Sequence, residues 1–153
     1  MEQILNLSSK WIPEKHLLHT RLSGDATQED IGLWEASLQE ALSGLKENSS
    51  FKILVDLHGF KAVDVDTHKK YRGIIPLTLA HYGWRIGYLD MFEEANNLIL
   101  HHLRGIHCVG AAHVHQDATK IEKYQSLYGR KNEKYFTDPE KAYQWIAGLP
   151  VGD

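Results

Sequence analysis

The sequence predicts an α/β fold in which helices cover a mainly parallel β-sheet. After two opening strands, apolar strand-like segments alternate with helical ones along the chain. Residues 51–57 form a short, nearly continuous apolar run, which is typical of a strand buried on both faces. Alternating strands and helices imply right-handed crossovers and parallel pairing. The opening strands are joined by a short turn, so we expect an antiparallel hairpin at one edge of a mixed sheet.

The hairpin and the first helix have clear local signals. Residues 4–7 and 15–22 alternate and are rich in leucine, with a turn-forming segment between them. Thr27 followed by Asp30 predicts a capping box at the start of a helix over residues 24–45. One face of that helix is apolar and comprises Ile31, Trp34, Leu38, Ala41 and Leu42.

A second helix is expected to follow the buried strand. It begins near Asp66, which we assign as its N-cap. Gly73 and Pro76 interrupt its pattern, because proline lacks a backbone donor and clashes with the preceding turn. The helix is therefore predicted to kink or split near Pro76.

The rest of the chain continues the alternation. Strands are predicted over residues 85–92, 106–114 and 133–136, and helices over 93–104, 117–129 and 138–149. Asp117 or Thr119 caps the middle helix of these three. Asp138 and Pro139 occupy the N-cap and the first position of the last helix.

Composition narrows the class of protein. The 153 residues suit a single domain over 1–153, with 42% hydrophobic and 24% charged residues. A net charge of −3 argues against a nucleic-acid partner. A lone cysteine, Cys108, suits a reducing cytoplasm and, inside a strand, is expected to be inert. No signal peptide is evident, and the longest apolar run is too short to span a bilayer.

Histidines and carboxylates gather at the predicted strand ends, where open α/β sheets bind ligands. His113 and His115 are two residues apart and share one face of a strand. With the carboxylate of Asp90 they could form a two-histidine, one-carboxylate metal site, and His58 is the other candidate for the third ligand. The alternative is that these residues act as caps and turn formers. We favour the alternative and expect no cofactor, because ten histidines make chance clustering common and no metal motif is present.

The segment from Phe51 to Ile75 resembles the signature of STAS domains, the fold of anti-sigma-factor antagonists. In that signature an apolar strand leads to Asp-Leu-Ser-Gly and then to Asp-Ser-Ser-Gly at the start of a helix. Here Asp56, Leu57 and Gly59 match the first part, His58 replaces its serine, and Asp64 matches the later aspartate. The element order and the ending, residues 132–146, are similar to the SpoIIAA-like branch of small bacterial proteins.

This resemblance implies a STAS-like fold and a non-catalytic protein that binds protein partners or small ligands. In the antagonists a serine of the second motif is phosphorylated, but here Val65 and Asp66 stand in that turn, and Thr67 replaces its glycine. The phosphorylation switch is therefore not expected. The SpoIIAA-like branch also resembles lipid-carrying domains of the Sec14 type.

The apolar segments around residues 73–84 suggest a ligand pocket. We expect a cavity beneath residues 71–84, above the small residues Gly110, Ala111 and Ala112, with exposed aromatic rings that suit a membrane surface. The candidate pocket and loop residues are His58, Asp64, Asp66, Thr67, Tyr71, Ile75, Leu79, Tyr82, Trp84, Gly110, Ala112, His113 and His115.

Three functions stay open at this point. The first is a cytoplasmic binding protein, not an enzyme, for an apolar small molecule or lipid, with peripheral membrane contact. The second is a regulator of a protein partner that lacks the phosphorylatable serine. The third is a metal-dependent enzyme that uses the strand-end histidines. The sequence leaves a homodimer open and identifies neither ligand nor partner.

Overall fold

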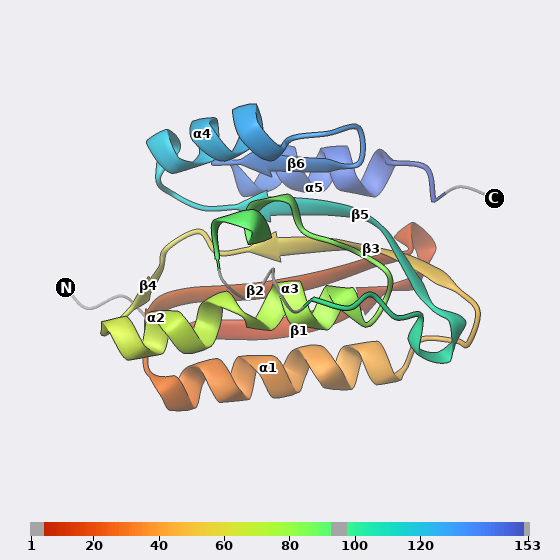
Figure 1. Cartoon of the computed structure of the whole chain (residues 1–153), viewed down its shortest axis with the longest axis horizontal. Coiled ribbons are helices and arrows are strands. Elements are labelled where there is room, and N and C mark those ends of the chain that lie inside the picture. Colours follow the sequence, from red (N-terminus) through yellow and green to blue (C-terminus); the bar gives the residue numbers. More distant parts are fainter. Residues whose placement is uncertain (1–4, 93–97, 152–153) are drawn as a thin grey trace.

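The computed structural model describes residues 5–92 and 98–151, except the side chain of Asp90. Figure 1 shows a mixed sheet with helices on both sides. Its strands are β1 (Asn6–Ile12), β2 (Leu17–Ala26), β3 (Ser50–Asp56), β4 (Phe60–Ala62), β5 (His107–Val114) and β6 (Glu133–Phe136). The helices are α1 (Gln28–Ser43), α2 (Val65–Arg72), α3 (Ile74–Ala80), α4 (Ala118–Tyr128) and α5 (Pro139–Gly148), with short 3₁₀ turns η1 (Pro13–Lys15), η2 (Gly87–Met91) and η4 (Leu103–Gly105).

The strand order is β1-β2-β3-β5-β6. The β1–β2 pair is an antiparallel hairpin, and every other pair is parallel, including the short β4, which pairs with the end of β2. The predicted fold class is therefore confirmed. Strand β4 escaped prediction because it has only three residues and lies within a polar stretch.

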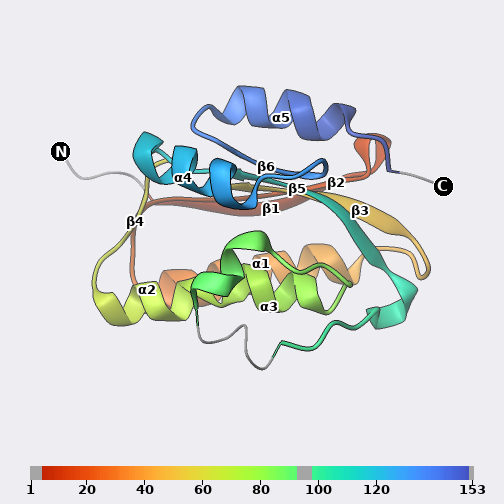
Figure 2. The ribbon, with the colours of Figure 1, turned by 45° about the horizontal axis from the view of Figure 1, so that its top comes forward.

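The helices divide between the two faces of the sheet. Figure 2 shows α5 on one face and α1, α2 and α3 on the other. Helix α4 contacts β6, at the sheet edge, and η2. Among the residues that the structure describes, no helix is long and apolar enough to cross a membrane.

Most of the helix starts that the sequence predicted from capping residues are present in the structure. Thr27 and Asp30 form the predicted capping box, with the Thr27 backbone N–H donating to the Asp30 carboxylate at 2.9 Å. Trp34 is fully buried, and its indole N–H donates to Thr20 Oγ1 at 2.8 Å. Asp117 and Asp138 cap α4 and α5. Cys108 is buried in β5, as expected, and burial raises the pKa of its thiol.

The prediction of a strand over residues 85–92 was wrong. Strands β3 and β5 pair directly, from Ser50 opposite His107 to Asp56 opposite Val114, which leaves no place for a strand between them. Residues Gly87–Met91 instead form the 3₁₀ turn η2. Ile86 and Leu89, three residues apart, are both buried, which matches the period of such a turn.

The prediction of a helix over residues 93–104 was also wrong for residues 98–104. Residues 93–97 lie outside the described part of the structure. The backbone N–H groups of His101 and Leu103 donate to the carbonyls of Ala80 and His81, so this segment runs along the end of α3. Arg104 has a φ of 55°, a left-handed conformation that interrupts any helix.

The second predicted helix splits, but at Gly73 and not at Pro76. Gly73 lies between α2 and α3. Pro76 is the third residue of α3, where a backbone N–H has no partner within its own helix, so the missing donor does no harm.

Candidate functional site

A pocket lies at the carboxyl ends of β3 and β5, between α2 and α4; we call it the α2–α4 pocket. It has an outer chamber of about 460 Å³ and an inner chamber of about 200 Å³. The two chambers share four lining residues, His68, Tyr71, His115 and Lys120. This is the edge at which an open α/β sheet binds its ligands.

The inner chamber is lined by aromatic side chains from α2, η2, β5, α4 and β6. The Tyr88 ring stacks on Tyr124 with centroids 5.8 Å apart and lies edge-on to His113 at 5.7 Å. His113 in turn stacks on Tyr135 at 4.7 Å. Burial raises the pKa values of Tyr71, Tyr88, Tyr124 and Tyr135, so these phenols stay neutral at physiological pH. The chamber is therefore apolar and bounded by mutually packed rings.

Glu133 is fully buried beneath these rings and ties three segments together. Its carboxylate accepts from Gly87 N–H at 3.1 Å and from the Trp84 indole at 3.4 Å, and lies 2.9 Å from His113 Nε2. Arg130 lies 3.4 Å from it. Burial alone would raise the pKa of this carboxyl, but the His113 hydrogen bond and the charges of His113 and Arg130 lower it. Glu133 is therefore ionised, and its partners make this buried charge tolerable.

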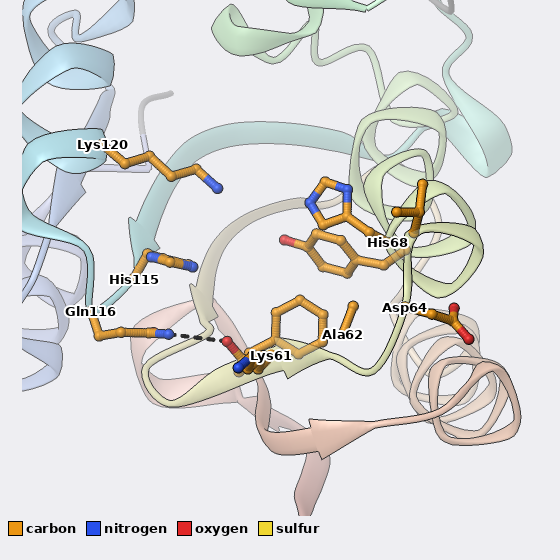
Figure 3. A pocket seen from close by; sticks show the side chains of 10 residues that line it. Lys61, Ala62, Asp64, His68, His115, Gln116 and Lys120 are labelled. Atoms are coloured by element: carbon orange, nitrogen blue, oxygen red, sulfur yellow. Dashed lines mark hydrogen bonds between the residues drawn. The ribbon is translucent and has the colours of Figure 1, made fainter.

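The mouth of the pocket carries nitrogen groups from both sides. Figure 3 shows His115 and Lys120 extending from the β5–α4 segment toward His68 on α2. His115 Nδ1 accepts the Asp117 backbone N–H at 3.1 Å, so the neutral ring carries its proton on Nε2. Burial, followed by the charge of Lys120, lowers the pKa of His115 to about 4. Burial likewise lowers the pKa values of His68 and Lys120.

Two other polar residues of the outer chamber have their hydrogen bonds within the protein. Asp64 accepts from the backbone N–H and hydroxyl of Thr67 at 2.8 and 2.7 Å and so caps α2. Gln116 accepts from Gly59 N–H at 2.9 Å and donates to the Phe60 carbonyl at 3.0 Å, which holds β4 against the β5–α4 loop (Figure 3).

The assignment of Asp66 as the N-cap of the second helix was wrong. The helix begins at Val65, so Asp64 holds the cap position and Asp66 lies in the first turn. Its charge still suits the positive end of the helix dipole. Thr67 is 1% exposed, and its hydroxyl is bonded to Asp64, which makes it a poor kinase substrate.

Of the predicted site residues, Asp64, Tyr71, His113 and His115 line the α2–α4 pocket. The others do not line either chamber: His58, Asp66, Thr67, Ile75, Leu79, Tyr82, Trp84, Gly110 and Ala112. His58 and Asp66 are exposed. Most of the rest are packed in the core.

The expected void above the small residues of β5 is filled instead. A side chain added at Gly110 would meet Leu149 Cδ2 at 2.5 Å. Ala112 packs in a cluster with Ala142 and Ile146 of α5. Ala111 faces the opposite side and is fully buried in the main core. Small strand residues here allow close packing and do not line a cavity.

The expectation of exposed aromatic rings around the helix break was wrong. Tyr82 and Trp84 are only 5% and 6% exposed. The Tyr82 ring meets Phe51 edge-on, and Arg130 lies 4.4 Å from the centre of the Trp84 ring. Tyr71 is half-buried between Trp34 and Phe60. These rings serve the core and the pocket, so the argument for a membrane surface loses its basis.

The two strand-end histidines both line the inner chamber. His113 is engaged with Glu133 and His115 with the backbone of Asp117. Within residues 5–92 and 98–151 no group of three or more potential ligands is placed to hold a metal ion. The side chain of Asp90, the proposed third ligand, lies outside the described part of the structure.

Sequence reasoning missed most of the pocket lining, including Lys120, Tyr124 and Tyr135, and it missed the buried Glu133 beneath the rings. A signal for the first two exists: Lys120, Ile121 and Tyr124 have the spacing of one helical face. The sequence carries no signal for Glu133, because a charged residue at the start of a short edge strand is common.

The architecture has a counterpart among solved structures. It matches the crystal structure of an uncharacterized protein of the DUF3478 family with a SpoIIAA-like fold, from Shewanella loihica PV-4. The TM-score is 0.53 at 14% sequence identity, and the match covers 95% of this chain and 98% of that one. No protein-family model and no curated protein matches the chain. The chain therefore has a SpoIIAA-like fold, as its sequence resemblance predicted.

Proposed function

We propose that this protein is a non-catalytic binding module for a compact, largely apolar small molecule held in the α2–α4 pocket. One observation carries the proposal: an inner chamber of about 200 Å³, walled by aromatic rings, lies at the ligand-binding edge of the sheet. Binding sites are commonly apolar hollows with a few polar groups at the mouth, and this pocket has that organisation.

The size of the inner chamber limits the ligand. A dry cavity of about 150 Å³ accommodates benzene. The inner chamber therefore suits one ring or two fused rings, with substituents that reach into the outer chamber. A diacyl lipid is far larger than this volume, so the proposal narrows the expected ligand from lipids to small molecules. Flat rings are favoured over chains, because aromatic walls interact best with aromatic guests.

Binding is favoured over the two other functions for specific reasons. A regulator of a protein partner would have to act without a phosphorylation switch, because Thr67 in the first turn of α2 is buried and bonded to Asp64, whereas a binding protein uses the pocket itself. A metal-dependent enzyme would need several ligands around one point, whereas His113 Nε2 is bonded to Glu133 and the described residues contain no group of three or more side chains placed to hold a metal ion.

The test is ligand-observed NMR with indole and the linear 1-octanol as probes. Indole is expected to bind with a Kd on the order of 0.1–1 mM, as suits a fragment of this size, and more tightly than octanol. Ile121→Phe fills the inner chamber from α4 and should abolish binding. Leu127→Phe is the matched control, because Leu127 is 60% exposed on the same helix. Indole binding that survives Ile121→Phe would refute the proposal.

A further inference from the structure

We infer that the ligand is an aromatic acid, whose anionic group binds Lys120 and His115 at the mouth while its ring enters the inner chamber. This inference rests on the proposed function and adds the charge and orientation of the ligand. It follows from which polar groups of the pocket have partners and which do not.

The mouth offers a cation, Lys120, and a neutral donor, His115, that line the same two chambers. Lys120 is half-buried and lines both chambers. No carboxylate of the described residues forms an ion pair with it. His115 keeps its proton on Nε2, because its Nδ1 accepts the Asp117 N–H. A carboxylate oxygen can accept from both an ammonium and an imidazole N–H, and bonds to charged groups are the stronger class.

The carboxylates in and beneath the described pocket, in contrast, already have donors, and so does the amide oxygen of Gln116. The Asp64 carboxylate is bonded to Thr67, and the Gln116 side chain bridges Gly59 and Phe60. The Glu133 carboxylate is enclosed by its own donors beneath the rings. A cationic ligand would find Lys120 at the mouth and no unused carboxylate among the described lining residues. An anionic ligand finds a counter-charge in Lys120, whose Nζ lies 5.6 Å from the centre of the Tyr124 ring of the inner chamber.

The inner chamber has one further polar group without a partner. Tyr135 lines this chamber and is 5% exposed, and its hydroxyl has no hydrogen-bond partner among the described residues. The Tyr88 backbone amide approaches it without the geometry of a hydrogen bond. Buried hydroxyls are normally bonded, so a ring substituent that reaches this hydroxyl from the inner chamber would complete it. We therefore expect a hydroxyl or similar group on the ring, remote from the acid.

Matched probes test the charge of the ligand. 3-Phenylpropionate and 3-phenylpropionamide have the same shape, but only the first is an anion. The acid should bind wild-type protein at least about tenfold more tightly than the amide, by calorimetry or NMR titration. Lys120→Met should remove that difference, and Lys123→Met, an exposed lysine on the same helix, should retain it. Should Lys120→Met fail to fold, the wild-type preference must still shrink as salt rises.

A second pair of probes tests the Tyr135 hydroxyl. 3-(4-Hydroxyphenyl)propionate should bind about fivefold more tightly than 3-phenylpropionate. Tyr135→Phe should remove this gain, whereas Tyr128→Phe, outside the pocket lining, should keep it.

The possible outcomes distinguish a failure of the anion inference from a failure of the proposed binding function. Equal binding of acid and amide, abolished in both cases by Ile121→Phe, would overturn the anion inference and leave the proposed function intact. Binding of neither probe, nor of indole, would overturn both. An acid preference that persists in Lys120→Met would show that the anion binds elsewhere and would contradict the inference.

Discussion

The two sides of the β3–β5 pair differ in an unexpected way. On the α5 side β5 presents the small residues Gly110 and Ala112, and the segment of α5 packs directly onto them, so that a side chain at Gly110 would overlap Leu149. On the α2–α4 side the side chains are among the largest in the protein, yet that side contains the inner chamber. The small residues lie under solid packing, and the cavity lies among tyrosines.

The difference shows what leaves a cavity open in a folded chain. A helix above small residues settles until atoms touch, because interiors are close-packed. On the other side, α4 packs at the β6 edge and against η2, while α2 packs against α1. The rings between them are rigid and brace one another, as in the Tyr88–Tyr124 stack. No helix can then descend onto the sheet between α2 and α4.

The largest expected effect comes from removing the buried carboxylate of the pocket side. Glu133→Ala should destabilise the protein by about 3–5 kcal/mol, because His113, Gly87 and Trp84 lose their common acceptor. Urea denaturation measures this, with Glu122→Ala on the exposed face of α4 as control. A loss below about 1 kcal/mol would mean that Glu133 does not organise this side.

A larger side chain should cost more stability on the close-packed α5 side of the sheet than on the side that contains the inner chamber. Gly110→Val should cost about 1–3 kcal/mol, because the new side chain overlaps Leu149. Ile121→Phe adds more atoms but has the inner chamber to enter, so its cost should stay below about 1 kcal/mol. Thermal or urea unfolding of both variants is the measurement. The reverse order of the two losses would contradict the comparison.

Acidification should lower the free energy of unfolding, in part because His115 of the pocket becomes protonated. Its pKa is about 4 in the folded protein against 6.5 normally. Above pH 6.5 both states are neutral; as pH falls toward 4, the unfolded state binds the proton first, so stability is lost across this window. The loss due to His115 should be about 1 kcal/mol after allowance for solvent screening.

His19 and His68 have lowered pKa values and act in the same direction, so the comparison must isolate His115. The unfolding free energy of wild type and His115→Gln, measured between pH 7 and 4.5, does so. Parallel pH curves for the two proteins would show that His115 is not buried as described.

The smallest effect distinguishes two aspartates at the start of α2. Asp64→Ala should lower the melting temperature, because the α2 cap is lost. Asp66→Ala should lower it less, since that residue contributes only through the helix dipole. Differential scanning calorimetry of the two variants decides the order, and a larger effect at Asp66 would restore the original assignment of the cap.

The sequence predicted those parts of the fold that depend on neighbours in the chain. The Thr27–Asp30 capping box and the continuous apolar run of β3 are local patterns, and both formed as expected. The alternation in residues 85–92 was misleading, because strand pairing depends on which partner is vacant, and β5 already occupies the edge of β3.

The pocket was harder to predict than the fold. His113 and His115 were found because they lie close together at a strand end. Tyr71, Tyr88, Tyr124 and Tyr135 come from four separate segments, and no spacing along the chain links them. These rings meet in one pocket only because α4 packs against β6 and η2, and this packing is a tertiary contact that no local pattern encodes.

The most direct test of this account is a crystal structure of the protein under xenon pressure. Xenon enters dry apolar cavities irrespective of their natural ligand. We predict a xenon site in the inner chamber, bounded by Tyr71, Tyr88 and Tyr124, and none between α5 and β5 beside Gly110. A site beneath α5 or α3 with an empty inner chamber would contradict the account.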